Sequence, residues 1–239
     1  MNDRIVCITG ASQGIGRGIA NSLSEEGYKV INLDIKAPET TEVFETIELD
    51  IGDSYCCSDT LEEVGQRFGC IDVLINCASI FSTLSMKPFW EIEIEEWESV
   101  IKVNLTGTFN TCKAAFPWLK RSRCPRIINF SSAVVPMGRP NYLHYVSSKA
   151  GVQGMTRAMA REVGDFGITV NAILPGATVT EVPRDTVSPE QMQAMINSRC
   201  LKRPQNVDDL SGIISFLCSD RSGFITGQSF VIDGGIVFN

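Results

Sequence analysis

A tyrosine and a lysine four residues apart, Tyr145 and Lys149 in the stretch "LHYVSSKAG", have the types and spacing of a proton-transfer pair. On a helix, positions i and i+4 lie on one face, one turn apart. A phenol titrates near ~10 in water and is a poor base at neutral pH, but a nearby ammonium favours the phenolate and lowers the pKa. Ordinary surface pairs show the same spacing, so the pair alone does not decide between chemistry and structure.

A glycine-rich loop supplies a second chemical feature. The stretch "TGASQGIG" (9–16) follows a predicted strand and precedes a predicted helix. Its glycines, Gly10, Gly14 and Gly16, let the backbone turn tightly and approach a pyrophosphate, which the first free amides of the helix can bind. Asp34 closes the next predicted strand, about 20 residues on, where a dinucleotide fold places the acid that binds the adenosine ribose.

Asp34 also indicates which dinucleotide is bound. A carboxylate at this position repels a 2′-phosphate, and no arginine or lysine occurs in 11–16 to offset it, although Lys36 lies nearby. The sequence therefore favours NAD over NADP.

Short apolar runs alternate with helical patterns along most of the chain. Apolar, β-branched segments predict strands at 4–9, 28–34, 44–49, 71–76, 126–131, 168–173 and 229–233. Apolar residues at helical spacing predict helices at 15–26, 59–68, 94–120, 145–164, 189–199 and 207–218. Strands that are apolar on both faces indicate a parallel sheet covered on both sides. We expect an α/β fold, a Rossmann-type doubly wound parallel sheet of about seven strands with helices on both faces, in a single domain spanning 1–239.

One crossover is short. Only "IKAPETTEV" lies between Asp34 and Phe44, and its proline and threonines favour a turn or a single helical turn over a full helix.

Composition excludes several classes of protein. The net charge of −7 over 239 residues argues against a nucleic-acid partner, which needs a basic surface. Nine cysteines occur without a CxxC pair or a cysteine–histidine cluster, so we expect no metal site, no disulfide framework and a reducing compartment. Cys7, Cys77, Cys112 and Cys218 lie in apolar stretches and are interpreted as small core residues. Without a signal segment or an apolar run near ~20 residues, we expect a cytoplasmic protein with no membrane contact.

The glycine spacing G-x-x-x-G-x-G, followed far downstream by Y-x-x-x-K, resembles that of the short-chain dehydrogenase/reductase family. Further similarities run nearly from end to end: "LDI" (49–51), "NCAS" (76–79), "KVNLTG" (102–107), "IINFSSA" (127–133), "NAILPGATVT" (171–180) and "FITGQSFVIDGG" (224–235). Several motifs in the family's order are far more specific than any one of them.

The resemblance implies catalytic roles for four side chains. Tyr145 would be the acid/base that exchanges a proton with the substrate oxygen, and Lys149 would lower its pKa and bind the nicotinamide ribose. Ser132 would hold the reacting oxygen, and Asn104 would hold a water in a proton relay to Lys149. The hydride would pass between the substrate carbon and the nicotinamide of NAD.

The resemblance also implies a set of cofactor-binding residues. They are Gly10, Ser12, Gln13, Gly14, Ile15, Gly16, Asp34, Asp50, Ile51, Asn76, Ala78, Tyr145, Lys149, Pro175, Gly176, Thr178 and Thr180. Two positions depart from the family's N-N-A-G motif: Cys77 replaces the second asparagine and Ser79 the glycine, and a side chain at 79 would crowd the cofactor ribose. His144, beside Tyr145, faces another way on a helix and is interpreted as structural or pocket-lining.

These features predict an NAD-dependent dehydrogenase acting on a small alcohol or ketone, namely a sugar, a polyol or a cyclic alcohol. The alternatives are an NADPH-dependent 3-oxoacyl reductase and a non-catalytic NAD-binding regulatory protein. We expect a short substrate lid at 181–203. The helices 94–120 and 145–164 are expected to pack across two-fold axes in a homo-oligomer, a tetramer or a dimer.

Overall fold

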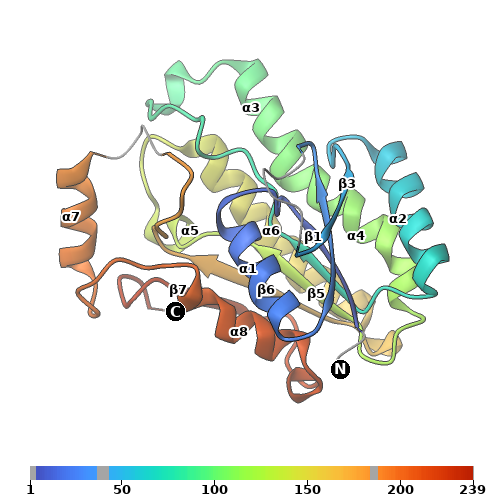
Figure 1. The fold of residues 1–239 in the computed structure, drawn as a ribbon. Helices are drawn as coiled ribbons and strands as arrows, with labels where there is room; N and C mark the ends of the chain where they lie inside the picture. Colours follow the sequence, from blue (N-terminus) through green and yellow to red (C-terminus); the bar gives the residue numbers. More distant parts are fainter. Residues whose placement is uncertain (1–3, 37–42, 184–187, 239) are drawn as a thin grey trace.

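The protein folds around one parallel sheet of seven strands, in the order β3-β2-β1-β4-β5-β6-β7 (Figure 1). The computed structural model describes residues 4–36, 43–183 and 188–238. The strands are β1 Ile5–Thr9, β2 Lys29–Asp34, β3 Glu45–Glu48, β4 Val73–Asn76, β5 Arg126–Phe130, β6 Thr169–Pro175 and β7 Ser229–Ile232. Each lies within or next to the segment predicted for it. The single-domain, doubly wound fold expected from the sequence is confirmed.

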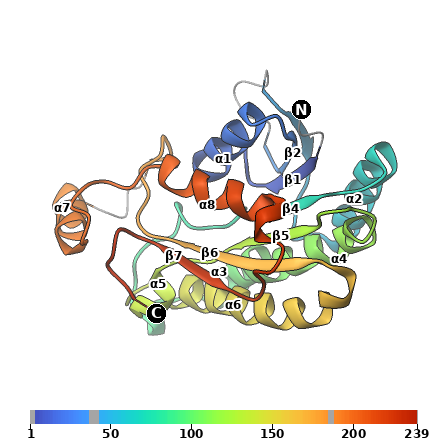
Figure 2. The same cartoon turned by 90° about the horizontal axis from the view of Figure 1, so that it is seen from below.

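Helices cover both faces of this sheet. The helices are α1 Gly14–Glu25, α2 Ser54–Phe68, α3 Ile94–Ile101, α4 Thr108–Leu119, α5 Val134–Met137, α6 Leu143–Glu162, α7 Pro189–Ser198 and α8 Asp208–Cys218. Short helical turns lie at η1 Phe89–Glu91, η2 Lys102–Gly107, η3 Gly164–Phe166 and η4 Asp220–Ser222. Figure 2 shows α1 and α8 on one face and α2, α4 and α6 on the other.

The central strands are apolar because both of their faces are covered. Every residue of β1, β4, β5 and β6 is buried. One core cluster joins the sheet to α2 and α4, and the other joins it to α1 and α8. This burial on both faces explains why the strand segments read as continuous apolar runs in the sequence.

The segment 94–120 differs from the single helix that we expected. It comprises α3, a π-helical turn at η2 and α4. The wider turn lies at Lys102–Gly107 and contains the buried Asn104. Such turns are rare and often occur at functional sites.

Two other expectations fall partly outside the described residues. The short crossover after Asp34 lies mostly at 37–42, and the expected lid at 181–203 includes 184–187. The described part of that second segment contains α7. This helix begins with a reciprocal cap, in which Ser188 Oγ accepts from the Gln191 amide at 3.2 Å and the Ser188 amide donates to Gln191 Oε1 at 2.9 Å.

No helix in the described part of the chain combines the length and the apolar character that crossing a bilayer requires.

Close packing of α2 on α4 depends on a glycine, and this generates a stability prediction. A β-carbon at Gly65 would overlap the indole ring of Trp118. We expect Gly65→Ala to lower the free energy of unfolding by about 2–3 kcal/mol, measured by urea denaturation. The control is Gly154→Ala on α6, where no atom lies within 4 Å of the added carbon. That substitution should raise the free energy of unfolding by about 0.5–1 kcal/mol. Equal effects at the two sites would contradict this account of the α2–α4 contact.

Candidate active site

A cavity of about 860 Å³ lies along the carboxyl edge of the sheet. The chain leaves β1 toward β2 and β3, then returns to place β4 on the other side of β1. In open α/β sheets, ligands bind outside the carboxyl ends of the strands where the strand order reverses in this way. The cavity extends from the glycine loop at the start of α1 to the residues that follow β5 and begin α6.

The glycine loop closes against the segment that follows β4. Gly10 has φ +74°, and a β-carbon there would lie 2.6 Å from the Cα of Ala78. A β-carbon at Gly16 would collide with the carbonyl oxygen of Gly10. Any side chain at either position would push the loop out of place, so the loop must be built from glycine.

The first turn of α1 already holds an anion. Gln13, at the N-cap position, makes no side-chain capping bond, and the Gly14 amide donates to Oε1 of Glu181 at 2.9 Å. This carboxylate lies where free amides and the positive end of the helix dipole favour negative charge. The residues present therefore fit a ligand with a diphosphate at this end of the cavity.

Asp34, at the end of β2, is fixed at the same end of the cavity. Its Oδ2 accepts from the Ser12 amide at 3.0 Å and its Oδ1 from the Lys36 amide at 3.2 Å. The Ser12 hydroxyl donates to the carbonyl of Lys36, which ties the loop after β1 to the residues after β2. Two backbone amides therefore fix the position of the Asp34 carboxylate on the cavity wall.

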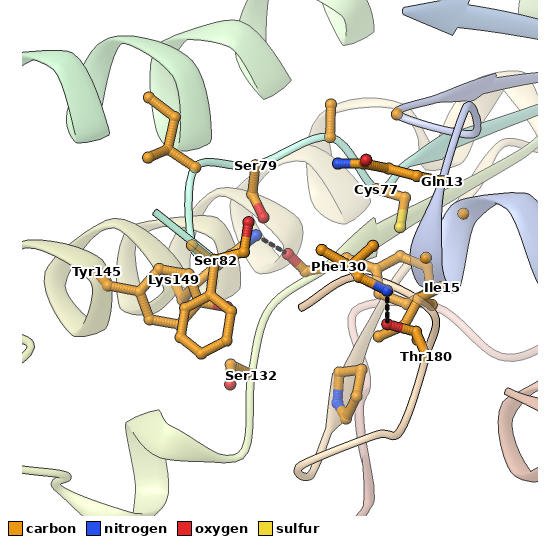
Figure 3. A pocket seen from close by; sticks show the side chains of 18 of the residues that line it. Gln13, Ile15, Cys77, Ser79, Ser82, Phe130, Ser132, Tyr145, Lys149 and Thr180 are labelled. Carbon is orange, nitrogen blue, oxygen red and sulfur yellow. Dashed lines mark hydrogen bonds between the residues drawn. The ribbon is translucent and has the colours of Figure 1, made fainter. Parts of the chain in front are cut away.

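The opposite end of the cavity brings Ser132, Tyr145 and Lys149 together (Figure 3). Ser132 follows β5, and α6 carries the other two side chains one turn apart. Tyr145 is 6% exposed and Lys149 2%. Lys149 Nζ lies 5.7 Å from the centre of the Tyr145 ring and donates to the carbonyl oxygen of Phe130 at 2.9 Å. Residues from two elements thus line one polar corner of the cavity.

Burial lowers the pKa of Lys149 from 10.5 to about 8. At neutral pH most molecules still carry the proton on Lys149, but it is held less tightly than on a lysine in water. The thiol of Cys77 lies on the same cavity wall, and burial raises its pKa to about 12, so it is neutral. Cys77 is half-buried: it packs against the core cluster that joins the sheet to α1 and α8, and it also lines the cavity, so its interpretation as a core residue holds only in part.

The ring of Phe81 packs against that of Tyr145. Its ring centre lies 4.6 Å from that of Tyr145, with 36° between the ring planes, and 5.9 Å from that of Tyr142. Arg139, whose guanidinium carbon lies 5.2 Å from the centre of the Tyr142 ring, lines the cavity beyond them. Phe81 thus gives the cavity wall an aromatic surface beside Tyr145, and Arg139 places a cation on the same wall.

The structure places Asn104 behind the cavity wall rather than on it. Its Oδ1 accepts from the Ile80 amide at 2.7 Å, and its Nδ2 donates to the Ile80 carbonyl at 3.1 Å. The same Nδ2 donates to Ser148 Oγ at 3.2 Å. The side chain therefore joins the segment after β4 to α6, one residue before Lys149.

Asn76 and Thr178 also lie behind the wall. Asn76 Nδ2 donates to Asn129 Oδ1 at 2.8 Å, and Thr111 Oγ1 donates to Asn76 Oδ1 at 2.6 Å. Thr178 is 1% exposed, and its hydroxyl donates to the Gly176 carbonyl at 3.2 Å. Asn76 is thus held by buried side chains and Thr178 by a backbone carbonyl, and neither side chain lines the cavity.

The remaining predicted positions line the cavity: Gly10, Ser12, Gln13, Gly14, Ile15, Gly16, Asp34, Asp50, Ile51, Ala78, Ser132, Tyr145, Lys149, Pro175, Gly176 and Thr180. His144 is fully buried, and its Nε2 lies 2.9 Å from Glu96 Oε1. Across residues 4–36, 43–183 and 188–238, no group of three or more histidine, cysteine or acidic residues could hold a metal ion.

Sequence reasoning did not find Phe81, and it included Glu181 only as part of the expected lid at 181–203, without a role at the glycine loop. Phe81 follows the quoted "NCAS" motif, and Glu181 follows Thr180, so their neighbours were recognised. Nothing in the local sequence indicates that Glu181 reaches a loop 167 residues earlier in the chain.

Comparisons with known proteins agree with this geometry. Residues 10–237 match the family model described as enoyl-(acyl carrier protein) reductase. The 3-oxoacyl-(acyl-carrier-protein) reductase of Staphylococcus aureus is 38% identical over 240 residues, covering 96% of each chain. The chain is a member of the short-chain dehydrogenase/reductase family.

Solved structures of similar proteins support the same assignment. The aldohexose dehydrogenase of Thermoplasma acidophilum superposes with a TM-score of 0.91 at 31% identity, covering 98% of this chain and 94% of that chain. Levodione reductase superposes with a TM-score of 0.88 at 28% identity, covering 98% of this chain and 97% of that chain. As a short-chain dehydrogenase/reductase, the protein is an oxidoreductase that acts on CH–OH groups.

The buried lysine generates a prediction about pH. In the unfolded chain the pKa of Lys149 returns to 10.5, whereas burial holds it at about 8 in the folded protein. Between these values the unfolded chain binds more protons, so this lysine makes the unfolding free energy rise with pH. The comparison variant is Lys149→Met, which removes the titrating group. We expect the difference in unfolding free energy, wild type minus variant, to rise by on the order of 3 kcal/mol from pH 8 to pH 10.5. Urea denaturation at a series of pH values measures this difference, and a flat profile would contradict it.

Proposed function

We propose that this enzyme uses NAD(H) to interconvert a secondary alcohol and a ketone, with Ser132, Tyr145 and Lys149 as its proton-transfer site. One observation carries the proposal. The three side chains line one end of a cavity whose other end presents a glycine loop and the fixed carboxylate of Asp34. A dinucleotide has the matching arrangement, with a ribose diol and a diphosphate at one end and a reactive ring at the other.

The residues present fit NAD. The Glu181 carboxylate accepts a hydrogen bond from the Gly14 amide, at the position where a diphosphate oxygen would bind. Asp34 would accept hydrogen bonds from the adenosine ribose, and Thr180, whose Oγ1 lies beside the glycine loop, also lines the cavity. When bound, the nicotinamide supplies or accepts the hydride.

The protein's own groups handle the proton. In ketone reduction, the Tyr145 hydroxyl donates its proton to the oxygen that becomes the alcohol, while the Ser132 hydroxyl donates a hydrogen bond to the same oxygen. The Lys149 ammonium favours the phenolate that this transfer leaves behind. Phe81, stacked on Tyr145, keeps water from that side of the phenol. In alcohol oxidation the same groups act in reverse.

Asn104 acts in this proposal by holding the Ile80 backbone and Ser148, which border Phe81 and Lys149. Its hydrogen bonds support a positioning role beside the relay role that the family resemblance implies. The short substrate lid at 181–203 remains part of the proposal, with Met195 on the cavity wall.

We favour a 3-oxoacyl thioester as the substrate class. The substrate end of the cavity is largely apolar, with Phe81, Val134, Met137, Met195 and Ile236 on its wall, which suits an acyl chain better than a polyhydroxylated sugar. The similarity to the Staphylococcus aureus reductase supports this choice. A cyclic alcohol or an aldohexose is the second candidate, supported by the structural similarity to levodione reductase and to aldohexose dehydrogenase.

We further propose a cytoplasmic homo-oligomer, a tetramer or a dimer, whose subunits meet through the helices at 94–120 and 145–164. Phe109 on α4 supports this interface, because its large apolar side chain is 46% exposed in the single chain.

Removing the phenol hydroxyl tests the proton-transfer role. We expect Tyr145→Phe to lower turnover by ~10²-fold or more while keeping NAD affinity within about an order of magnitude. The assay follows the absorbance of the reduced cofactor with a panel of 3-oxoacyl thioesters, cyclic ketones and aldohexoses. The control is Tyr55→Phe on α2, where the ring is 82% exposed. Near-normal turnover of Tyr145→Phe on the best substrate would remove Tyr145 from the mechanism.

Cofactor choice depends on Asp34 and is tested by binding alone. We expect the wild type to bind NAD at least ~10-fold more tightly than NADP, because the fixed carboxylate repels the 2′-phosphate. Asp34→Asn should reduce this preference several-fold, whereas the exposed Asp59→Asn on α2 should not change it. Both dissociation constants come from fluorescence titration. Tighter binding of NADP by the wild type would favour the NADPH-dependent alternative.

A further inference from the structure

The carboxylate of Glu181 lies inside the cofactor cavity, at the start of α1. Its Oε1 accepts from the Gly14 amide at 2.9 Å and lies 4.0 Å from Arg17 Nη1. The neighbouring residues lie against the same loop, since a β-carbon at Gly14 would be 3.3 Å from Val182 Cγ2 and 3.9 Å from Thr180 Oγ1. The segment 180–182 therefore brings a negative charge to the glycine loop.

This position can hold only one anion at a time. The amide of Gly14 is one of the donors that the helix offers to a diphosphate, and Glu181 already accepts from it. A diphosphate that came to the same amide would also meet the carboxylate's charge at close range. Binding of the cofactor therefore requires the Glu181 side chain to leave.

We propose that Glu181 is an internal competitor for the diphosphate subsite and thereby sets how tightly the enzyme binds its dinucleotide. The proposal rests on the proposed use of NAD(H). In the free protein the carboxylate satisfies the end of α1, and the cofactor displaces it. The apparent affinity is then reduced by the fraction of molecules in which Glu181 occupies the subsite.

The surroundings of Glu181 allow this exchange. Its side chain is 55% exposed and that of Arg17 is 29% exposed, so the carboxylate can turn toward solvent without being buried elsewhere. The same arrangement weakens the binding of small anions, such as free phosphate. They can bind only at the subsite that Glu181 already occupies. A dinucleotide adds the contacts of its adenosine and nicotinamide ends and can displace the carboxylate.

Two substitutions test the proposal by binding rather than by turnover. Glu181→Gln keeps the shape of the side chain and removes the charge, and Glu181→Ala removes the acceptor as well. We expect both to lower the dissociation constant of NAD, measured by calorimetry, by about three- to tenfold, with the larger effect for Glu181→Ala. The control is Glu162→Gln at the end of α6, an exposed acid outside the cavity that changes the net charge equally.

Smaller probes locate the effect. ADP and inorganic pyrophosphate should bind more tightly to Glu181→Ala than to the wild type, whereas adenosine, which lacks a phosphate, should bind equally to both. Circular dichroism at the same temperature checks that the variants are folded.

The outcomes separate this inference from the proposed function. If NAD binds the wild type but neither Glu181 variant tightens NAD, ADP or pyrophosphate binding, the competitor role is overturned. If adenosine tightens as much as ADP, the effect does not act on the phosphates and the proposal is again wrong. If NAD binds none of the proteins but pyrophosphate still binds Glu181→Ala more tightly, the subsite assignment holds and the proposed cofactor is wrong.

Discussion

The structure depends on one constraint: a parallel sheet brings the carboxyl ends of all its strands to the same edge. Residues far apart in the chain therefore meet there, including Asp34 at the end of β2, Ser132 after β5 and Thr180 after β6. The reversal of strand order between β1 and β4 opens this edge into a cavity. Without that reversal the glycine loop and the tyrosine–lysine pair would have no common space to face.

The two ends of the cavity differ in electrostatic character: one favours negative charge and the other contains a buried cation. At the glycine loop, backbone amides and a helix end favour negative charge, and the protein itself supplies it through Glu181. At the far end, a buried cation is held by the carbonyl of Phe130 and by no described carboxylate, so burial lowers the pKa of Lys149. An ammonium whose charge is poorly compensated interacts strongly with any negative charge that develops beside it, such as a phenolate or an alkoxide.

Hydrogen bonds behind the cavity wall keep these groups in place. Asn104, in the π-helical turn, binds both backbone groups of Ile80 and the hydroxyl of Ser148. Ile80 precedes Phe81, which packs on Tyr145, and Ser148 precedes Lys149. One buried amide therefore links the aromatic cover of the phenol to the helix that carries the phenol and the lysine. Buried polar groups that are fully paired in this way make a site rigid.

The sequence by itself determined the fold class, most strand and helix segments to within about five residues, and 16 of the residues that line the cavity. It could do so because burial on both faces leaves continuous apolar strands, and because a tight phosphate turn demands glycine at Gly10 and Gly16. Only the tertiary structure decided that Asn76, Asn104 and Thr178 lie behind the wall, that the helix at 94–120 breaks at a π-helical turn, and that Phe81 and Glu181 enter the site. These are contacts between distant segments, and local periodicity carries no information about which side chain meets which across a fold.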